Sequence, residues 1–224
     1  MRKSVKEALS LDYNVSMYKK KPIFSFIKRL FDIVSSGLAI ILFSWLFIII
    51  AILVKCSSKG PVLYGHKRIG KNGKEIKIWK FRSMRQDNRP IEEVLTPEQL
   101  EEWKRDYKVT DDPRVTKIGK FLRKSSLDEL PQLFNIFIGQ ISVVGYRPVI
   151  KEELESKYSE EEQKLLLKTK PGLTGFWASH GRSDTSYEDR VKMELYYCYK
   201  RSIWLDIRIL WHTVIGVFRH DGAK

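Results

Sequence analysis

The sequence has little cysteine and histidine, the residues that build disulfide frameworks and many metal sites. Its two cysteines, Cys56 and Cys198, are far apart and outside any Cys-x-x-Cys spacing, and its four histidines lack the spacing of metal ligands. This pattern argues against a zinc site and gives no sign of a disulfide framework. We expect both cysteines to be buried thiols, and we assign no catalytic role to the histidines.

Internal repeats and low-complexity tracts are absent as well, and acidic residues are scarce relative to basic ones. The 224 residues suffice for one domain, or a domain with an anchor, that buries a real core. With 41 Lys and Arg against 27 Asp and Glu, the net charge is +14, which suits nucleic acid, anionic lipid or a phosphorylated substrate. No helix-turn-helix or aromatic RNA-binding pattern is present, so we expect no nucleic acid as a partner.

Charge is missing from one long apolar stretch, the 22 residues 33–54. At about 1.5 Å per residue this stretch is long enough to cross a hydrocarbon core of about 30 Å. It is too long for a cleaved signal peptide, begins too late and lacks a small-residue exit.

Basic residues flank this stretch on both sides. Residues 1–32 carry eight Lys and Arg, and residues 55–85 carry ten, so the positive-inside rule places both ends on the cytoplasmic side. A helix that enters the membrane and turns back would satisfy the rule, whereas an ordinary single span would not, and the residues alone leave both open. Small or hydroxyl residues that could support a bend are Ser35, Ser36, Gly37 and Ser44.

The remaining chain predicts a mixture of helices with one hairpin. Residues 1–27 are basic and irregular, and we expect a mobile or surface-lying tail. Alternating apolar residues at 62–64 and 76–81, separated by a Gly-Lys-Asn-Gly turn, predict a β-hairpin. Helical patterns follow at 91–108, 126–138, 152–168, 186–199 and 203–218. The last mixes aromatic residues with a basic face, as interfacial helices do, although an ordinary core helix fits as well.

The central stretch, residues 125–135, places Asp128 and Glu129 side by side at a predicted helix start. The pattern S-x-x-E that begins at Ser126 fits a capping box, which alone would make both acids structural. Pro131 argues against this reading because it cannot donate to the carbonyl four residues earlier, so we expect a kink or a later helix start. Consecutive helical residues point about 100° apart, so the two acids should have separate tasks. A helix N-terminus would keep Asp128 ionised and attract phosphate.

Phosphate chemistry beside two acids requires cations. The candidates are Lys80, Arg82, Arg123, Arg147 and Arg182. The first two lie on a basic strand that a solvated face would also explain, whereas the last two lie in turns that restrict an Arg and favour bidentate contacts to phosphate. Magnesium, held by carboxylate and phosphate oxygens, is the expected cofactor.

Several short motifs follow one another in a specific order. They are Lys28-Arg29-Leu30-Phe31-Asp32, Lys80-Phe81-Arg82-Ser83-Met84, Asp112-Pro113-Arg114, Ser126-Leu127-Asp128-Glu129-Leu130-Pro131-Gln132-Leu133, Gly145-Tyr146-Arg147-Pro148, Pro171-Gly172-Leu173-Thr174-Gly175 and Trp204-Leu205-Asp206. Together they resemble the bacterial sugar transferases, the monotopic phosphoglycosyl transferases that start polysaccharide and glycoconjugate assembly on polyprenyl phosphate.

The resemblance implies transfer of a sugar 1-phosphate from a UDP-sugar to undecaprenyl phosphate, with release of UMP, as the first membrane step of exopolysaccharide, capsule or glycoconjugate synthesis. Asp128 would be the nucleophile that forms an aspartyl-phosphosugar intermediate, and Glu129 the paired carboxylate, both near Mg²⁺. Lys80, Arg82, Arg147 and Arg182 would bind substrate phosphate. A non-catalytic scaffold that holds anionic membrane lipid is the alternative.

The resemblance also implies a re-entrant helix rather than a single span. The expected fold is therefore α+β and mainly helical, a monotopic membrane protein with one re-entrant helix, interfacial amphipathic helices and a small β-hairpin. We expect a basic segment at 1–27, the re-entrant helix at 28–56, a catalytic domain at 57–218 on the cytoplasmic face of the inner membrane, and a tail at 219–224. Larger relatives carry an added N-terminal membrane region, so this chain resembles a short form that is nearly all catalytic domain.

Two departures from the family pattern affect these expectations. Ser44-Trp45 stands where the family usually has Ser-Pro, so the sharpness of the helix bend does not follow from the pattern. Tyr146 replaces the first proline of the usual Gly-Pro-Arg-Pro, which should make that loop less rigid.

Overall fold

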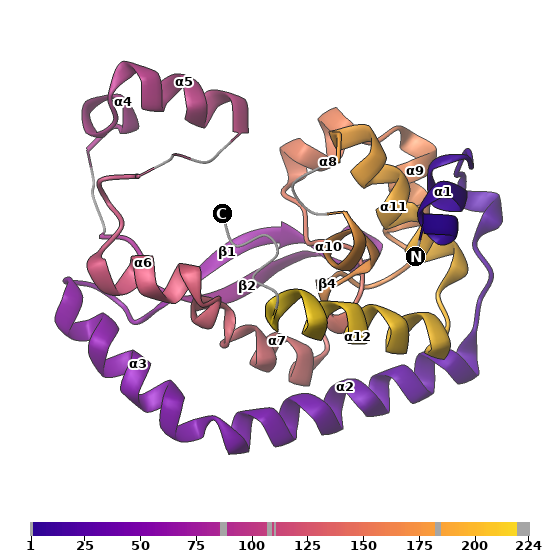
Figure 1. Cartoon of the computed structure of the whole chain (residues 1–224), viewed down its shortest axis with the longest axis horizontal. Helices are drawn as coiled ribbons and strands as arrows, with labels where there is room; N and C mark the ends of the chain where they lie inside the picture. The colour runs from indigo at the N-terminus through magenta and orange to yellow at the C-terminus, as the bar shows by residue number, and fades with distance from the viewer. Residues whose placement is uncertain (1, 86–88, 107–108, 110, 182–184, 219–224) are drawn as a thin grey trace. The chain divides into compact units, whose positions relative to one another are not determined.

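The computed structural model describes residues 2–85, 89–106, 109, 111–181 and 185–218 (Figure 1). The described chain is mainly helical and contains two small two-stranded sheets, as the sequence predicts. It divides into a larger unit, Met1–Ile41 with His66–Ile78 and Gln132–Lys224, and a smaller unit, Leu42–Gly65 with Trp79–Pro131. The segments of the two units alternate along the chain, and the linear division predicted from the sequence stays a prediction.

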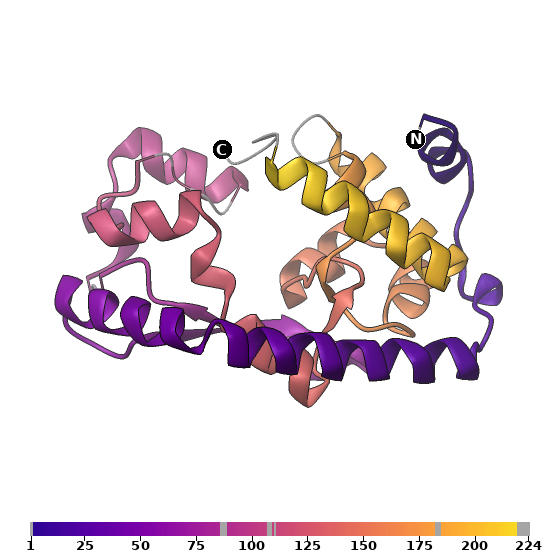
Figure 2. The same cartoon turned by 60° about the horizontal axis from the view of Figure 1, so that its bottom comes forward.

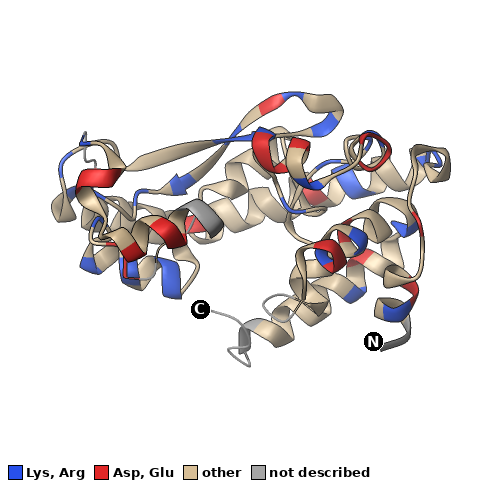
Figure 3. Ribbon diagram, turned by 90° about the horizontal axis from the view of Figure 1, so that it is seen from above, with Lys and Arg blue, Asp and Glu red and all other residues tan. Residues whose placement is uncertain are grey.

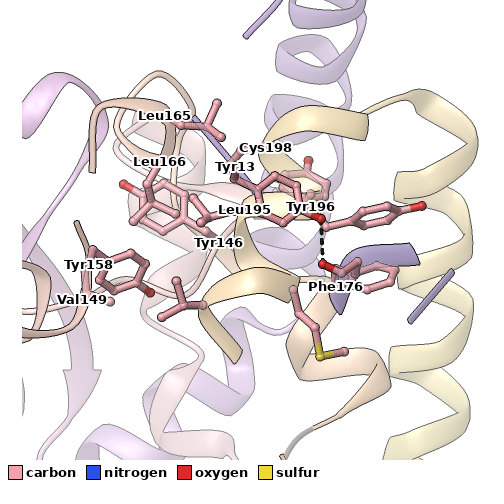
Figure 4. Close-up of a cluster of buried hydrophobic side chains, with 14 of the residues drawn as sticks. Tyr13, Tyr146, Val149, Tyr158, Leu165, Leu166, Phe176, Leu195, Tyr196 and Cys198 are labelled. Atoms are coloured by element: carbon pink, nitrogen blue, oxygen red, sulfur yellow. Dashed lines mark hydrogen bonds between the residues drawn. The ribbon is translucent and has the colours of Figure 1, made fainter. Parts of the chain in front are cut away.

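The core of the larger unit is built mainly from helices. Figure 4 shows the aromatic and aliphatic side chains that meet there, among them the fully buried Tyr146 and Phe176. The helices that contribute are α1 (Arg2–Leu9), α8 (Lys151–Lys157), α9 (Glu160–Leu166), α10 (Phe176–His180), α11 (Tyr187–Lys200) and α12 (Ile203–Phe218). Helix α12 packs against α10 and is the yellow helix in the turned view of Figure 2.

The N-terminal segment belongs to this core, so the expectation of a mobile or surface-lying tail is wrong. Helix α1 packs on α11, and Ala8 is completely buried. Tyr13 is 7 % exposed, and its hydroxyl donates to the carbonyl of Ala8 at 2.9 Å. The apolar positions Val5, Ala8 and Leu9 have the spacing of one helix face, a signal that the high charge of the segment obscures.

Strands β3 (Ser142–Val144) and β4 (Gly172–Thr174) form a parallel pair in the larger unit. The backbone of Gly145, directly after β3, lies very close to Gly172 in β4, since a Cβ on Gly172 would lie 2.1 Å from the amide nitrogen of Gly145. The next residue, Tyr146, is fully buried, and its carbonyl accepts from the Gly172 amide at 2.8 Å. Packing and backbone bonds therefore hold this turn where the family usually has a proline.

Helix α7 (Gln132–Ile138) ends at Gly139, whose φ of 87° is in the left-handed region. This is the predicted stop. The Arg29 guanidinium donates to the carbonyls of Ile136 and Phe137 at 2.8 and 2.7 Å, so a cation from α2 (Pro22–Leu42) satisfies two carbonyls in the last turn of α7.

The predicted β-hairpin is present as β1 (Leu63–Ile69) and β2 (Glu75–Phe81). Asn72 and Gly73 both have positive φ, 59° and 75°, as the Asn-Gly signal predicts. The turn between the strands is the short helix η2 (Lys71–Gly73).

The smaller unit has its own apolar cluster. Helix α3 (Ser44–Ser57) packs on α6 (Lys117–Lys124), with Ile50, Val54, Phe81 and Leu122 buried. Gly119 on α6 lets the backbone come close: a Cβ there would lie 1.9 Å from the carbonyl oxygen of Ser83. The short helices α4 (Ile91–Val94) and α5 (Pro97–Asp106) occupy the region predicted to be helical, and Thr96 and Gln99 cap α5 reciprocally.

The long apolar stretch is broken in the middle. Helix α2 ends at Leu42, α3 begins at Ser44, and their axes differ by 63°. Within the described residues, neither helix alone has the length and apolar character of a membrane span, but the two pass that test together. The break falls at Phe43, directly before Ser44, which is one of the four positions the sequence suggested.

Two further expectations need correction. The helix predicted over 152–168 is two helices, α8 and α9, because Ser159 and Glu162 form a capping box that starts a new helix. Cys198 is buried as expected, but Cys56 is exposed, since it lies on a part of α3 that does not face the apolar cluster.

Candidate active site

The segment that carries the acidic pair is not an ordinary helix start. Ser126 adopts a left-handed conformation with φ of 57°, and its side chain makes no capping hydrogen bond. The acids lie in a single turn, η3 (Leu127–Glu129), and the next helix begins only at Gln132. The capping box is therefore not formed, and the later helix start expected from Pro131 is confirmed.

Glu129 is held by a lysine from the hairpin. Its Oε1 lies 2.5 Å from Nζ of Lys80, and about a third of each side chain is exposed. An ion pair this open to water contributes little to stability. Its effect is to fix the direction of the Glu129 carboxylate, away from any role as a helix cap.

Asp128 lies in a different environment from its neighbour. It is only 7 % exposed. Burial is the main cause of a raised pKa of its carboxyl, and the negative charge of Glu129 raises the pKa further. The positive charges of Lys80 and Arg123 lower it. The net direction is upward, opposite to the stabilisation expected from a helix N-terminus, because a single turn supplies little dipole to offset the loss of water.

Two arginines of the smaller unit have distinct partners. Arg123 donates from Nε to the Ser83 hydroxyl at 2.9 Å and lies close enough to Asp128 to affect its pKa. Arg82 is 6 % exposed, and its guanidinium donates to the carbonyls of Pro61, Val54 and Ser58. These bonds tie Arg82 to the segment after α3, and phosphate binding by Arg82 stays a prediction.

The larger unit holds Arg147 in a cluster that the sequence did not reveal. Glu153 on α8 lies 3.7 Å from Arg147 and from Arg68, and it accepts from Arg190 and from the Tyr187 hydroxyl at 2.9 and 2.8 Å. Burial would raise the pKa of Glu153, but the charges of Arg190 and Arg147 and these hydrogen bonds hold it below its ordinary value. Nothing in the local sequence of Glu153 marks it, because its partners come from three separate segments.

The remaining predicted residue, Arg182, lies outside the described residues. Of the other predicted site residues, the smaller unit holds Lys80, Arg82, Asp128 and Glu129, and the larger unit holds Arg147. Figure 3 shows Lys and Arg, in blue, distributed widely over the ribbon.

The acidic pair offers carboxylate oxygens suited to Mg²⁺. No group of three or more His, Cys, Asp or Glu side chains that could hold a metal occurs in the described part of the chain. Because Mg²⁺ is commonly bound by one or two carboxylates together with substrate phosphates and water, two acids fit such a site. The upward pKa of the buried Asp128, with Glu129 beside it, is consistent with a site that gains from a bound cation.

Comparison with known proteins identifies the protein family of the chain. The family model of the bacterial sugar transferases matches residues 23–220. The chain belongs to the bacterial sugar transferases. This bacterial sugar transferase is 44 % identical over 206 residues to the exopolysaccharide production protein ExoY of Rhizobium meliloti, a match that covers 91 % of this chain and 90 % of ExoY.

Other relatives of this bacterial sugar transferase carry more specific names. It is 43 % identical to the undecaprenyl-phosphate galactose phosphotransferase of Salmonella typhimurium and 40 % identical to the UDP-glucose:undecaprenyl-phosphate glucose-1-phosphate transferase of Escherichia coli. The matches cover 88 % of this chain but only 42 % and 41 % of those longer proteins. The similarity to them therefore concerns less than half of their length.

Proposed function

We propose that this chain transfers a sugar 1-phosphate from a UDP-sugar to undecaprenyl phosphate, releasing UMP, as an early membrane step of exopolysaccharide or capsule synthesis. Relatives whose names specify this class of reaction match 88 % of the chain. The structural observation that carries the proposal is the different placement of the two acids. Glu129 is paired with Lys80, whereas Asp128 lies buried beside it, and neither caps a helix.

In the proposed reaction an oxygen of Asp128 attacks the phosphorus next to the sugar. The bond from that phosphorus to the bridging oxygen breaks, UMP leaves with the bond electrons, and an aspartyl-phosphosugar remains. A phosphate oxygen of undecaprenyl phosphate then attacks the same phosphorus and frees Asp128. Lys80 keeps Glu129 oriented, and the positive charges of Lys80 and Arg123 favour the ionised nucleophile. Mg²⁺ bound near Asp128 and Glu129 would neutralise phosphate charge.

A covalent intermediate suits two substrates of such different character. The donor is soluble and the acceptor is a lipid, so each can use the same site in turn. The proposed setting is the cytoplasmic face of the inner membrane, with α2 and α3 forming a re-entrant helix. The break at residue 43 near the middle of the charge-free stretch, and the basic residues on both flanks, support this topology.

The proposal is tested by UMP release from the purified chain with Mg²⁺, undecaprenyl phosphate and a panel of UDP-sugars, beginning with UDP-galactose and UDP-glucose. Asp128→Asn should lower the rate by about a thousandfold or more, because the amide is not a nucleophile. Asp111→Asn is the matched control: Asp111 is also acidic and in the smaller unit, but its side chain is 78 % exposed and paired with Lys120. It should keep the rate of the unmodified chain.

The intermediate has its own measurement. Without lipid acceptor, the chain incubated with donor should gain the mass of a phosphosugar on the peptide that contains Asp128 and release one equivalent of UMP. Release that strictly requires lipid, without a mass gain, would contradict the covalent step. Failure to release UMP from any UDP-sugar would favour the non-catalytic scaffold.

A further inference from the structure

A small basic pocket lies in the larger unit between the first half of α2, the η2 turn of the hairpin and the segment after α9. Its volume is about 90 Å³, far below the roughly 300–1,000 Å³ of sites for drug-sized ligands. Six cationic residues line it, against the single acid Asp32: Lys28, Arg29, Lys71, Lys168, Lys170 and Arg201. The pocket therefore has room for one small group and a strong excess of positive charge.

Three of these six cations already bind partners within the protein. Lys28 pairs with Asp206 at 2.6 Å, Arg29 donates to the end of α7, and Arg201 donates to the carbonyls of Lys19 and Cys198. Asp32 is also engaged, since it accepts from the Ser142 hydroxyl and the Val143 amide, both at 2.9 Å. The one acid of the pocket is therefore not an ion-pair partner for the other cations.

The other three lysines have no such partner. No carboxylate among the described residues forms an ion pair with Lys71, Lys168 or Lys170. Burial and the nearby charge of Arg29 lower the pKa of Lys170, and the charge of Asp32 offsets only part of this lowering. Because like charges face one small space, an anion placed there would relieve their repulsion.

The surface beside the pocket is apolar. On the first half of α2, Ile23, Phe26 and Leu30 are 76, 72 and 54 % exposed, and Phe24 on the same helix lines the pocket. A cationic pocket next to exposed apolar side chains matches a lipid, whose charged headgroup and acyl chains are adjacent.

We propose that this pocket binds a phosphate ester, supplied by the headgroup of an anionic membrane phospholipid. The Lys71, Lys168 and Lys170 ammonium groups contact the phosphate oxygens, and the acyl chains lie along the exposed residues of α2. Such a bound lipid anchors the larger unit at the membrane surface. No residue that lines this pocket has a role in the proposed reaction, so the lipid site can be tested independently of that reaction.

The test uses the full chain in neutral detergent and compares short-chain phosphatidylglycerol with short-chain phosphatidylcholine by calorimetric titration. Lys71→Gln combined with Lys170→Gln removes two pocket charges. Lys74→Gln combined with Lys117→Gln removes the same net charge from exposed positions that do not line the pocket. We expect the pocket variant to bind phosphatidylglycerol about tenfold more weakly, and the control variant to change by less than about twofold.

Inorganic phosphate distinguishes the source of the ligand. Weak phosphate binding with tight phosphatidylglycerol binding supports the lipid. Phosphate that binds as tightly, and loses affinity only in the pocket variant, overturns the lipid assignment in favour of a soluble ester. Equal effects of the two double variants, or none, would show that general surface charge attracts the anion and would refute the site. Lys71→Gln alone, at an exposed turn position, keeps the test valid if the double variant does not fold.

Discussion

The buried Glu194 on α11 should make the free energy of unfolding depend on pH. Its side chain is 1 % exposed, and within the described chain its Oε2 has no hydrogen-bond partner. Burial raises the pKa of Glu194 from 4.5 to about 7, although the charges of Arg190 and Arg147 and the Arg147 amide act in the opposite direction. The folded chain therefore keeps a proton on Glu194 at pH values where the unfolded chain has lost it.

The sign follows from this raised pKa. The contribution of Glu194 to stability is fully present below about pH 4.5 and is lost as the pH rises through about 7. The whole difference corresponds to about 3 kcal/mol, of which about 2 kcal/mol falls between about pH 5.5 and about pH 8. For a chain of this size that is a shift of about 4–8 °C in melting temperature.

The assay is thermal unfolding of the unmodified chain and of Glu194→Gln over this pH range in the same detergent. Gln does not titrate, so the variant should gain on the unmodified chain by about 2 kcal/mol as the pH rises. Taking the difference at each pH removes other titrating groups, including His180, whose pKa burial lowers to about 4. The exposed Glu152, changed to Gln, is the control because it removes the same acidic group from the surface. A difference for Glu194→Gln that does not change with pH would refute the reasoning.

Two further predictions concern the packing of α6 and the α2–α3 helix pair. Gly119→Ala should destabilise the fold by about 3 kcal/mol or more in thermal unfolding, because its Cβ would overlap the Ser83 carbonyl. Gly216→Ala is the control: no atom lies within 4 Å of a Cβ at that position, so this variant should be neutral or stabilising. Equal effects of the two variants would contradict the close approach at Gly119. The proposed re-entrant topology is tested by placing single cysteines at the exposed positions 20 and 59, in a chain whose exposed Cys56 is replaced by Ser. Both cysteines should be labelled from the same side of sealed vesicles. Labelling from opposite sides would indicate a true span.

Features governed by neighbouring residues could be predicted from the sequence. The Asn-Gly turn at Asn72, the stop at Gly139 and the late helix start after Pro131 depend on local backbone conformation, and all three occur. The break at Phe43 lies next to Ser44, one of four candidates, and the sequence pattern does not choose among them because hydroxyl and small residues are compatible with both bent and straight helices.

Features governed by distant packing could not be predicted. The N-terminal segment looked like a tail because its basic residues hide the few apolar ones that reach the core. The separation of α8 from α9 depends on Ser159 as a cap within a continuous amphipathic pattern. In the candidate site, the acids and Lys80 could be named, but the bonds of Arg82 to backbone carbonyls and the cluster around Glu153 arise only from tertiary structure.

If α2 enters a bilayer as in the proposed topology, the bonds made by Asp32 limit how far it can enter. Asp32 and Ser36 are 2 % and 1 % exposed, and Asp32 is bonded to Ser142 and Val143, so this part of the helix is docked on protein. Only the last part of α2, residues 37–42, extends beyond the buried Ser36, a length of about 9 Å. In the proposed topology the docked part limits the depth of the helix, and α2 would enter no more than about a third of a hydrocarbon layer of about 30 Å.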